Sequence, residues 1–206
     1  MPPRHANAIA HLSAADPVLG GWIAQAGPCS LRRERGGTHF ASVARSIVYQ
    51  QLSGKAAGTI YARFEAIFGG RSPEPAELLK VKPPALRAVG LSERKAEYLL
   101  GLAKDVRSGR IPLASVDEMP DHEVIETLTA VRGVGEWTAQ MFLMFRLGRP
   151  DVLPTLDLGV QNAIKKLYGL RTHPKPERVA TIGAKWAPYR TVASWYLWRV
   201  VDDPPQ

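Results

Sequence analysis

Apolar residues recur three or four positions apart through most of the chain, which is the spacing of one face of an α-helix. This spacing predicts helices at residues 39–50, 54–68, 93–109, 121–131, 136–148, 157–168 and 191–200. The segment 136–148 is apolar almost all round, so it should lie at the centre of the core. Strict alternation of apolar and polar residues, which marks strands, is scarce. The chain is therefore predicted to be all-α.

Residues at the ends of these segments predict where the helices begin. Ser53, Ser92 and Asp121 stand just before or at the start of apolar patterns and are predicted to cap the helices that follow. Three proline-rich stretches are predicted to be loops that separate helices: residues 72–77, 82–84 and 172–177.

The composition narrows the class of protein. With 206 residues, 45% of them apolar, the chain can form one compact domain or two small lobes. No apolar stretch has the length of a transmembrane helix, and the N-terminus lacks the charged-then-apolar pattern of an export signal. The single cysteine, Cys29, excludes an intramolecular disulfide and a four-cysteine metal site, and it fits a reducing cytosol.

The net charge of +8 favours a polyanionic partner such as nucleic acid. Within this basic chain, LTAVRGVGEWTAQ at 128–140 is predicted to form a helix, a Gly-x-Gly turn and a second helix. Gly133 and Gly135 permit positive φ and a close approach, and the amides that start the second helix can bind a DNA phosphate. A lone Gly-x-Gly turn is more commonly an ordinary corner between helices, but the flanking Val131 and Val134 favour the functional interpretation.

The hairpin is part of a longer pattern. LPTLDLGVQNAIKKLYGL follows at 153–170, with Asp157 placed 22 residues beyond Gly135. Together the two segments resemble the helix-hairpin-helix DNA glycosylases that carry a Gly/Pro-rich loop and a catalytic aspartate. Further similar segments, at 44–64, 90–103 and 185–198, extend the resemblance to most of residues 9–200. It is closest to the DNA-3-methyladenine glycosylase II family, in a short form without the extra N-terminal β domain.

The resemblance implies an all-α, two-lobed helix-hairpin-helix DNA glycosylase fold with a cleft between the lobes. One lobe would comprise residues 39–147 and carry the hairpin and the wedge loop that enters the duplex. The second lobe would combine residues 1–38 with 148–206 and carry Asp157. Ligand sites are common at such junctions.

Asp157 stands at the start of a predicted helix, where the helix dipole favours an ionised carboxylate. An isolated aspartate there is usually an N-cap, whereas the resemblance implies that Asp157 is catalytic; the two roles are compatible. Ordinary glycosidases use two carboxylates because the leaving alcohol must be protonated. A purine methylated at N3 or N7 already carries positive charge, so one carboxylate suffices, either to stabilise the oxocarbenium-like sugar or to activate a water. The nearest other acid in the matched motifs, Glu136, is expected to be exposed.

Trp137 occupies the position at which relatives that also cut the DNA strand carry a nucleophilic lysine. The resemblance therefore implies hydrolysis by water without AP lyase activity. An indole here suits stacking on a flipped cationic base, although core packing is the plainer interpretation of Trp137. The resemblance assigns the rest of the base pocket to Met141, Trp198 and Gln50. Met141 stands where the family has a tyrosine, which leaves the base preference open.

Gln51 takes the place of the wedge that fills the gap left by the flipped nucleotide, where the closest relatives use leucine. Leu52 is also a candidate DNA contact, but for this residue we favour core packing. The resemblance assigns phosphate binding at the hairpin to Gly133, Val134, Gly135 and Thr138. It assigns a structural Na⁺ or K⁺ to the backbone carbonyls of Thr129, Val131 and Val134.

The function implied is a monofunctional DNA glycosylase that hydrolyses the N-glycosidic bond of alkylated bases, chiefly 3-methyladenine and 7-methylguanine, in base excision repair. Its partner would be double-stranded DNA, with no catalytic cofactor and no membrane. A cytoplasmic monomer, nucleoid-associated in a bacterium, is the default expectation. Two alternatives stay open: a non-catalytic helix-hairpin-helix protein that binds DNA damage, and a glycosylase for oxidised or mismatched bases.

Overall fold

The computed structural model describes residues 5–202, and every regular element in this range is helical, which confirms the predicted all-α class. The chain forms two compact units: Glu34–Phe142, here the central unit, and Met1–Arg33 with Leu143–Gln206, here the terminal unit. The predicted boundaries, 39 and 147, lie five residues beyond the observed 34 and 142. The second boundary moves because Phe145 packs against the core of the terminal unit, although it continues a helical segment that starts in the central unit.

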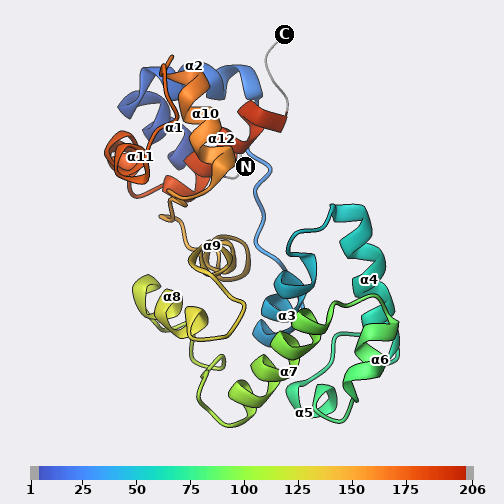
Figure 1. Ribbon diagram of the computed structural model, residues 1–206. Helices are drawn as coiled ribbons and strands as arrows, with labels where there is room; N and C mark the ends of the chain where they lie inside the picture. Colours follow the sequence, from blue (N-terminus) through green and yellow to red (C-terminus); the bar gives the residue numbers. More distant parts are fainter. Residues whose placement is uncertain (1–4, 203–206) are drawn as a thin grey trace. The chain divides into compact units, whose positions relative to one another are not determined.

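The central unit is built around α7, which contacts α3, α5 and α6, while α8 and α9 pack against each other (Figure 1). Fully buried Leu99 and Leu102 of α7 and Ile47 of α3 belong to its apolar interior. Its helices are α3 (His39–Tyr49), α4 (Gly54–Ala66), α5 (Pro75–Leu78), α6 (Pro83–Ala88), α7 (Glu93–Arg107), α8 (Asp121–Thr129) and α9 (Glu136–Met141).

The terminal unit packs α12 against α10, α2 and α1, around a core that contains fully buried Trp186 and Tyr196. Figure 1 shows α10 and α12 side by side in this unit. Its helices are α1 (Ala6–Ala15), α2 (Pro17–Ala26), α10 (Leu158–Leu167), α11 (Pro176–Gly183), the 3₁₀ turn η2 (Ala184–Trp186) and α12 (Arg190–Asp202). A π-helical segment, η1 (Phe142–Leu147), follows α9 directly and leads into this unit.

Two of the three predicted caps are confirmed. The hydroxyls of Ser53 and Ser92 each accept a hydrogen bond from the backbone amide three residues further on, at 3.4 and 3.3 Å. The prediction for Asp121 is wrong, because Pro120 occupies the N-cap of α8 and Asp121 is the first residue of the helix. An acidic side chain is also favourable in the first turn, where it faces the positive end of the helix dipole, so the sequence signal fits both positions.

The proline-rich stretches are not simple loops. The helices α5, α6 and α11 begin at Pro75, Pro83 and Pro176, inside or at the end of the stretches predicted to be loops. Proline is well suited to the first helical position, because its missing N–H would have no partner there. The helices α1 and α2 were not predicted; Gly20 permits their close packing, since a Cβ there would lie 2.9 Å from the Ser13 carbonyl oxygen.

The segment predicted as one helix at 136–148 changes its winding at Phe142. It is α-helical to Met141 and π-helical from Phe142 to Leu147, and four of these six π-helical residues are buried. The sequence pattern does not reveal this change. When nearly every side of a segment is apolar, its residues are buried in an α-helix and in a π-helix alike. Single π-helical turns are frequent beside functional sites. Within residues 5–202 no helix is long and apolar enough to cross a membrane.

Candidate functional site

Asp157 is the N-cap of α10, as its place in the sequence predicts. Its Oδ1 atom accepts a hydrogen bond from the Val160 amide at 2.8 Å, so the side chain lies over the first turn of the helix. The preceding loop is also held in place. The side chain of Gln161, only 8% exposed, donates to the Thr155 carbonyl at 2.8 Å, and the Asp157 amide donates to the Pro154 carbonyl at 3.1 Å. The aspartate therefore sits on a well-supported turn and remains partly exposed.

Trp198 contacts this carboxylate directly. Its indole Nε1 donates to Asp157 Oδ1 at 2.9 Å, from α12 to the start of α10. The indole stacks on the ring of Phe145, with 6.0 Å between ring centroids and 22° between planes. Of the predicted site residues, Asp157 and Trp198 are thus brought together within the terminal unit.

Two residues that support this pair were missed by the sequence interpretation. Phe145 stacks on the indole, and Gly159 leaves room for it: a Cβ on Gly159 would lie 2.9 Å from Trp198 Cδ1 and 3.0 Å from Asp157 Oδ1. A glycine two positions after an N-cap is an unfavourable choice inside a helix, so the sequence did carry a signal that space is needed there.

The hairpin turn joins α8 to α9 and treats its two glycines differently. Gly133 has φ +90° and lies against the Tyr98 ring, where a Cβ would come within 2.1 Å of Tyr98 Cδ2. Gly135 is extended, with φ −96°, and a Cβ there would meet nothing within 4 Å. The flanking Val131 and Val134 are buried, 1% and 6% exposed, and hold the turn in the core. Positive φ is therefore needed only at Gly133, whereas Gly135 provides an open, exposed backbone.

The side chains of α9 divide into exposed and buried positions. Trp137 is 47% exposed, so the core-packing interpretation of this residue is wrong. Met141, one turn further along, is half-buried, and Glu136 is exposed as expected. Thr138 is only 6% exposed, which gives the predicted phosphate contact through its hydroxyl no support.

The segment predicted to be the wedge loop, residues 50–53, follows α3. Gln51 is exposed and has φ +56°, a left-handed conformation that is uncommon for a residue other than glycine. Leu52 is 39% exposed, so the prediction that it packs in the core is wrong. Leu52 lies between the left-handed Gln51 and Ser53, the N-cap of α4. The Gln50 side chain does not point freely outward: its Nε2 donates to the Gly133 carbonyl at 2.8 Å.

The predicted cation ligands are neutral peptide oxygens close together in sequence, at Thr129, Val131 and Val134. Such carbonyl oxygens suit a monovalent cation. The Val131 carbonyl accepts one hydrogen bond, from the Val134 amide at 3.0 Å, and a carbonyl has a second lone pair. The Na⁺ or K⁺ site stays a prediction. Across residues 5–202 no group of three His, Cys, Asp or Glu side chains forms a metal-binding cluster.

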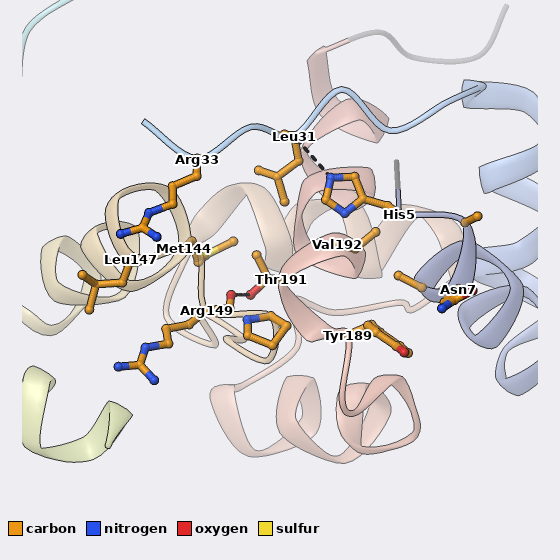
Figure 2. A pocket seen from close by; sticks show the side chains of 14 residues that line it. His5, Asn7, Leu31, Arg33, Met144, Leu147, Arg149, Tyr189, Thr191 and Val192 are labelled. Atoms are coloured by element: carbon orange, nitrogen blue, oxygen red, sulfur yellow. Dashed lines mark hydrogen bonds between the residues drawn. The ribbon is translucent and has the colours of Figure 1, made fainter. Parts of the chain in front are cut away.

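A cavity of about 560 Å³ lies elsewhere in the terminal unit. Figure 2 shows Arg33 and Arg149 at one end of it and Asn7 with Tyr189 at the other. Its described lining does not include Asp157 or Trp198, so it is separate from the carboxylate site.

The chain is similar to several known proteins. DNA-3-methyladenine glycosylase 1 of Schizosaccharomyces pombe is 37% identical over 162 residues, which cover 78% of this chain and 71% of that protein. The crystal structure of a DNA-3-methyladenine glycosidase from Bacillus halodurans superposes with a TM-score of 0.85 at 41% identity, covering 95% of this chain and 89% of that one. The S. pombe 3-methyladenine DNA glycosylase in complex with abasic DNA also gives a TM-score of 0.85, at 33% identity, covering 97% and 98%.

The relatives differ in length. The chain spans 57%, 91% and 71% of three curated relatives that it matches. Residues 44–189, which include the predicted wedge loop, the hairpin and Asp157, match the family described as HhH-GPD superfamily base excision DNA repair protein. The chain belongs to the HhH-GPD superfamily of base excision DNA repair proteins.

Proposed function

We propose that this protein is a monofunctional DNA glycosylase of the DNA-3-methyladenine glycosylase II type, which removes 3-methyladenine and 7-methylguanine from double-stranded DNA. The observation that carries the proposal is the partly exposed Asp157 carboxylate, held at the start of α10 by the Trp198 indole and the Val160 amide. The names of the relatives supply the class of substrate.

The chemistry needs only one carboxylate if the base leaves as a neutral purine. Methylation at N3 or N7 makes the bound base cationic, and cleavage of the N-glycosidic bond then transfers the bonding electron pair to the base. Positive charge develops on the sugar, and the fixed negative charge of Asp157 stabilises it. A water adds to the sugar carbon and loses a proton, which completes the hydrolysis. Because both described hydrogen bonds reach Oδ1, they hold the carboxylate in one orientation before the substrate binds.

Trp137 supports hydrolysis rather than strand cleavage. A lyase forms a covalent imine between an amine and the sugar. The second residue of α9 is an indole, which has no such amine. Its 47% exposure leaves the ring accessible for stacking on an extruded cationic base, worth roughly 0.5–2 kcal/mol.

We assign the hairpin turn to sequence-independent binding of the DNA backbone. The exposed amide region at Gly135 and the start of α9 can approach a phosphate without steric hindrance, and contacts of this type position a protein without specifying sequence. The net charge of +8 adds long-range attraction to the duplex. If the source is a bacterium, a protein that acts on chromosomal DNA would work in the cytoplasm, at the nucleoid.

The decisive experiment incubates wild type and Asp157→Asn with methylated duplex DNA and measures free base and strand scission separately. We expect base release without scission from the wild type and its loss in Asp157→Asn. Binding without any base release by the wild type would identify a damage-binding protein instead. A covalent complex trapped by borohydride would identify a lyase.

The two hairpin glycines provide a matched test of DNA binding. Gly133→Ala should destabilise the fold, because the new Cβ would collide with Tyr98, and it should also impose positive φ on an alanine. Gly135→Ala should lower the melting temperature much less, by the modest cost of an alanine at the N-cap of α9, but weaken duplex binding, because the methyl group blocks close approach to the backbone. Thermal denaturation and fluorescence anisotropy would measure the two effects. Unchanged DNA affinity in Gly135→Ala would argue against the proposed phosphate site.

A further inference from the structure

Side chains of helix α7 contact both loops of the central unit that the proposed function assigns to DNA. These are the wedge loop, residues 50–53, and the hairpin turn, residues 130–135. Three residues make the contacts. Lys95 and Tyr98 lie on α7, and Gln50 lies in the wedge loop itself.

Lys95 holds the wedge loop. Its Nζ atom donates to the carbonyl oxygens of Val48 and Gln50, at 2.7 Å each. These carbonyls belong to the last turn of α3 and the residue after it, where helix geometry leaves carbonyl groups without partners and a cation is favourable. Lys95 is partly buried, and the resulting desolvation lowers its pKa.

Gln50 and Tyr98 contact the hairpin turn at Gly133. Gln50 Nε2 donates to the Gly133 carbonyl at 2.8 Å, so the wedge loop and the turn share a direct hydrogen bond. Tyr98 lies three residues after Lys95 on the same face of α7, and Gly133 lies against its ring. The left-handed Gln51 and the exposed Leu52 follow immediately after the residue that both contacts fix.

We propose that Lys95 and Gln50 are positioning residues, which hold the wedge loop in register with the hairpin turn so that Gln51 enters the duplex while the hairpin binds the phosphates. The inference rests on the proposed function. It also reassigns Gln50: its side-chain amide supports the wedge rather than contacting the base. A lysine that merely capped α3 would affect folding stability without affecting base unstacking in the bound complex.

Base unstacking can be measured without any bond cleavage. The probe is a duplex with a tetrahydrofuran abasic analogue next to 2-aminopurine, whose fluorescence rises when it loses its stacking partner. Saturating protein is added, so that the ratio of unstacked to stacked complex is compared at full occupancy. Lys95→Met should lower this ratio about tenfold, the effect of losing hydrogen bonds from a charged group.

Lys104→Met is the matched control, because it removes the same charge from an exposed position of the same helix. It should unstack the probe as the wild type does, and Lys95→Arg should restore part of the effect because the cation is kept. Gln50→Leu cuts the second connection without altering α7 and should reproduce the defect, including when Lys95→Met fails to fold. Wild-type unstacking in folded Lys95→Met or in Gln50→Leu, or an equal loss in Lys104→Met, would overturn the proposal.

The same proteins are assayed for base release from a duplex containing 7-methylguanine. Normal unstacking by the wild type without base release would contradict the proposed function and leave the positioning role supported. Base release by the wild type together with unchanged unstacking in Gln50→Leu would contradict the positioning role alone.

Discussion

Two aspartates of the terminal unit occupy the same local position and have opposite surroundings. Asp16 caps α2 and Asp157 caps α10, and each accepts a hydrogen bond from a tryptophan indole, Trp186 to Asp16 at 2.8 Å and Trp198 to Asp157 at 2.9 Å. Asp16 is 0% exposed, whereas Asp157 is partly exposed. Both aspartates share the N-cap position and the indole hydrogen bond. The difference in exposure distinguishes Asp16, a structural acid, from Asp157, the candidate catalytic acid.

The partners of Asp16 occupy both of its oxygens. Oδ1 accepts from the amides of α2, and Oδ2 accepts from Trp186 and Tyr168 and lies 3.1 Å from Lys185 Nζ. Burial alone would raise the pKa of Asp16, but the hydrogen bonds from Tyr168, Trp186 and Lys185 outweigh it and hold this pKa below its ordinary value. A carboxylate surrounded in this way stabilises α2, η2 and Tyr168 against one another and cannot reach a substrate.

The largest expected effect is on stability. Asp16→Ala should lower the free energy of unfolding by about 3–5 kcal/mol, because it leaves buried donors without their charged acceptor. Urea denaturation followed by circular dichroism measures the change. A loss below about 1 kcal/mol would show that Asp16 is not the structural acid described here.

Asp157→Asn should show the reverse pattern. Asparagine caps a helix about as well as aspartate, so stability should change little. The rate of base release should fall roughly 10²–10³-fold, the usual cost of removing one electrostatic stabiliser of a transition state. Single-turnover release of 7-methylguanine measures it. If the activity of Asp157→Asn fell only in proportion to its folded fraction, Asp157 would be a structural acid like Asp16, which contradicts the proposal.

The two tryptophans sharpen the comparison. Trp198→Phe keeps an aromatic ring beside Phe145 but removes the N–H that orients Asp157, so base release should slow about tenfold at nearly unchanged stability. Trp186→Phe should instead cost about 1–3 kcal/mol of stability and leave the rate per folded molecule unchanged. The paired measurements are melting curves and single-turnover rates. Equal effects on both quantities in the two variants would contradict the assignment.

The smallest expected effect is on acid stability. Because the folded-state pKa of Asp16 lies below its unfolded value, its contribution is complete above about pH 4 and is lost as the pH falls through the folded-state pKa. Asp16→Asn, which cannot titrate, should show a shallower loss of stability below about pH 4 than the wild type. Unfolding free energies measured across this range test it; parallel curves for the two proteins would contradict the stated role.

Local sequence determined the helices with strong apolar periodicity, the caps at Ser53, Ser92 and Asp157, and the hairpin with its exposed glycine. These features depend on residues within a few positions of one another. Prediction failed where one local signal fits two structures: the proline-rich stretches begin helices, Asp121 follows its cap, and the apolar segment at Phe142 changes to a π-helix.

Only the tertiary structure decided which side chains meet. Trp198 lies 41 residues from Asp157, and Trp186 lies 170 residues from Asp16, so no spacing in the sequence distinguishes the two pairs. The same holds for Lys95, whose contacts with the loop after α3 reach back 45 and 47 residues. Periodicity encodes which face of a helix is buried, but the partner on the other side depends on how the helices pack, and that packing determines the surroundings of each acid.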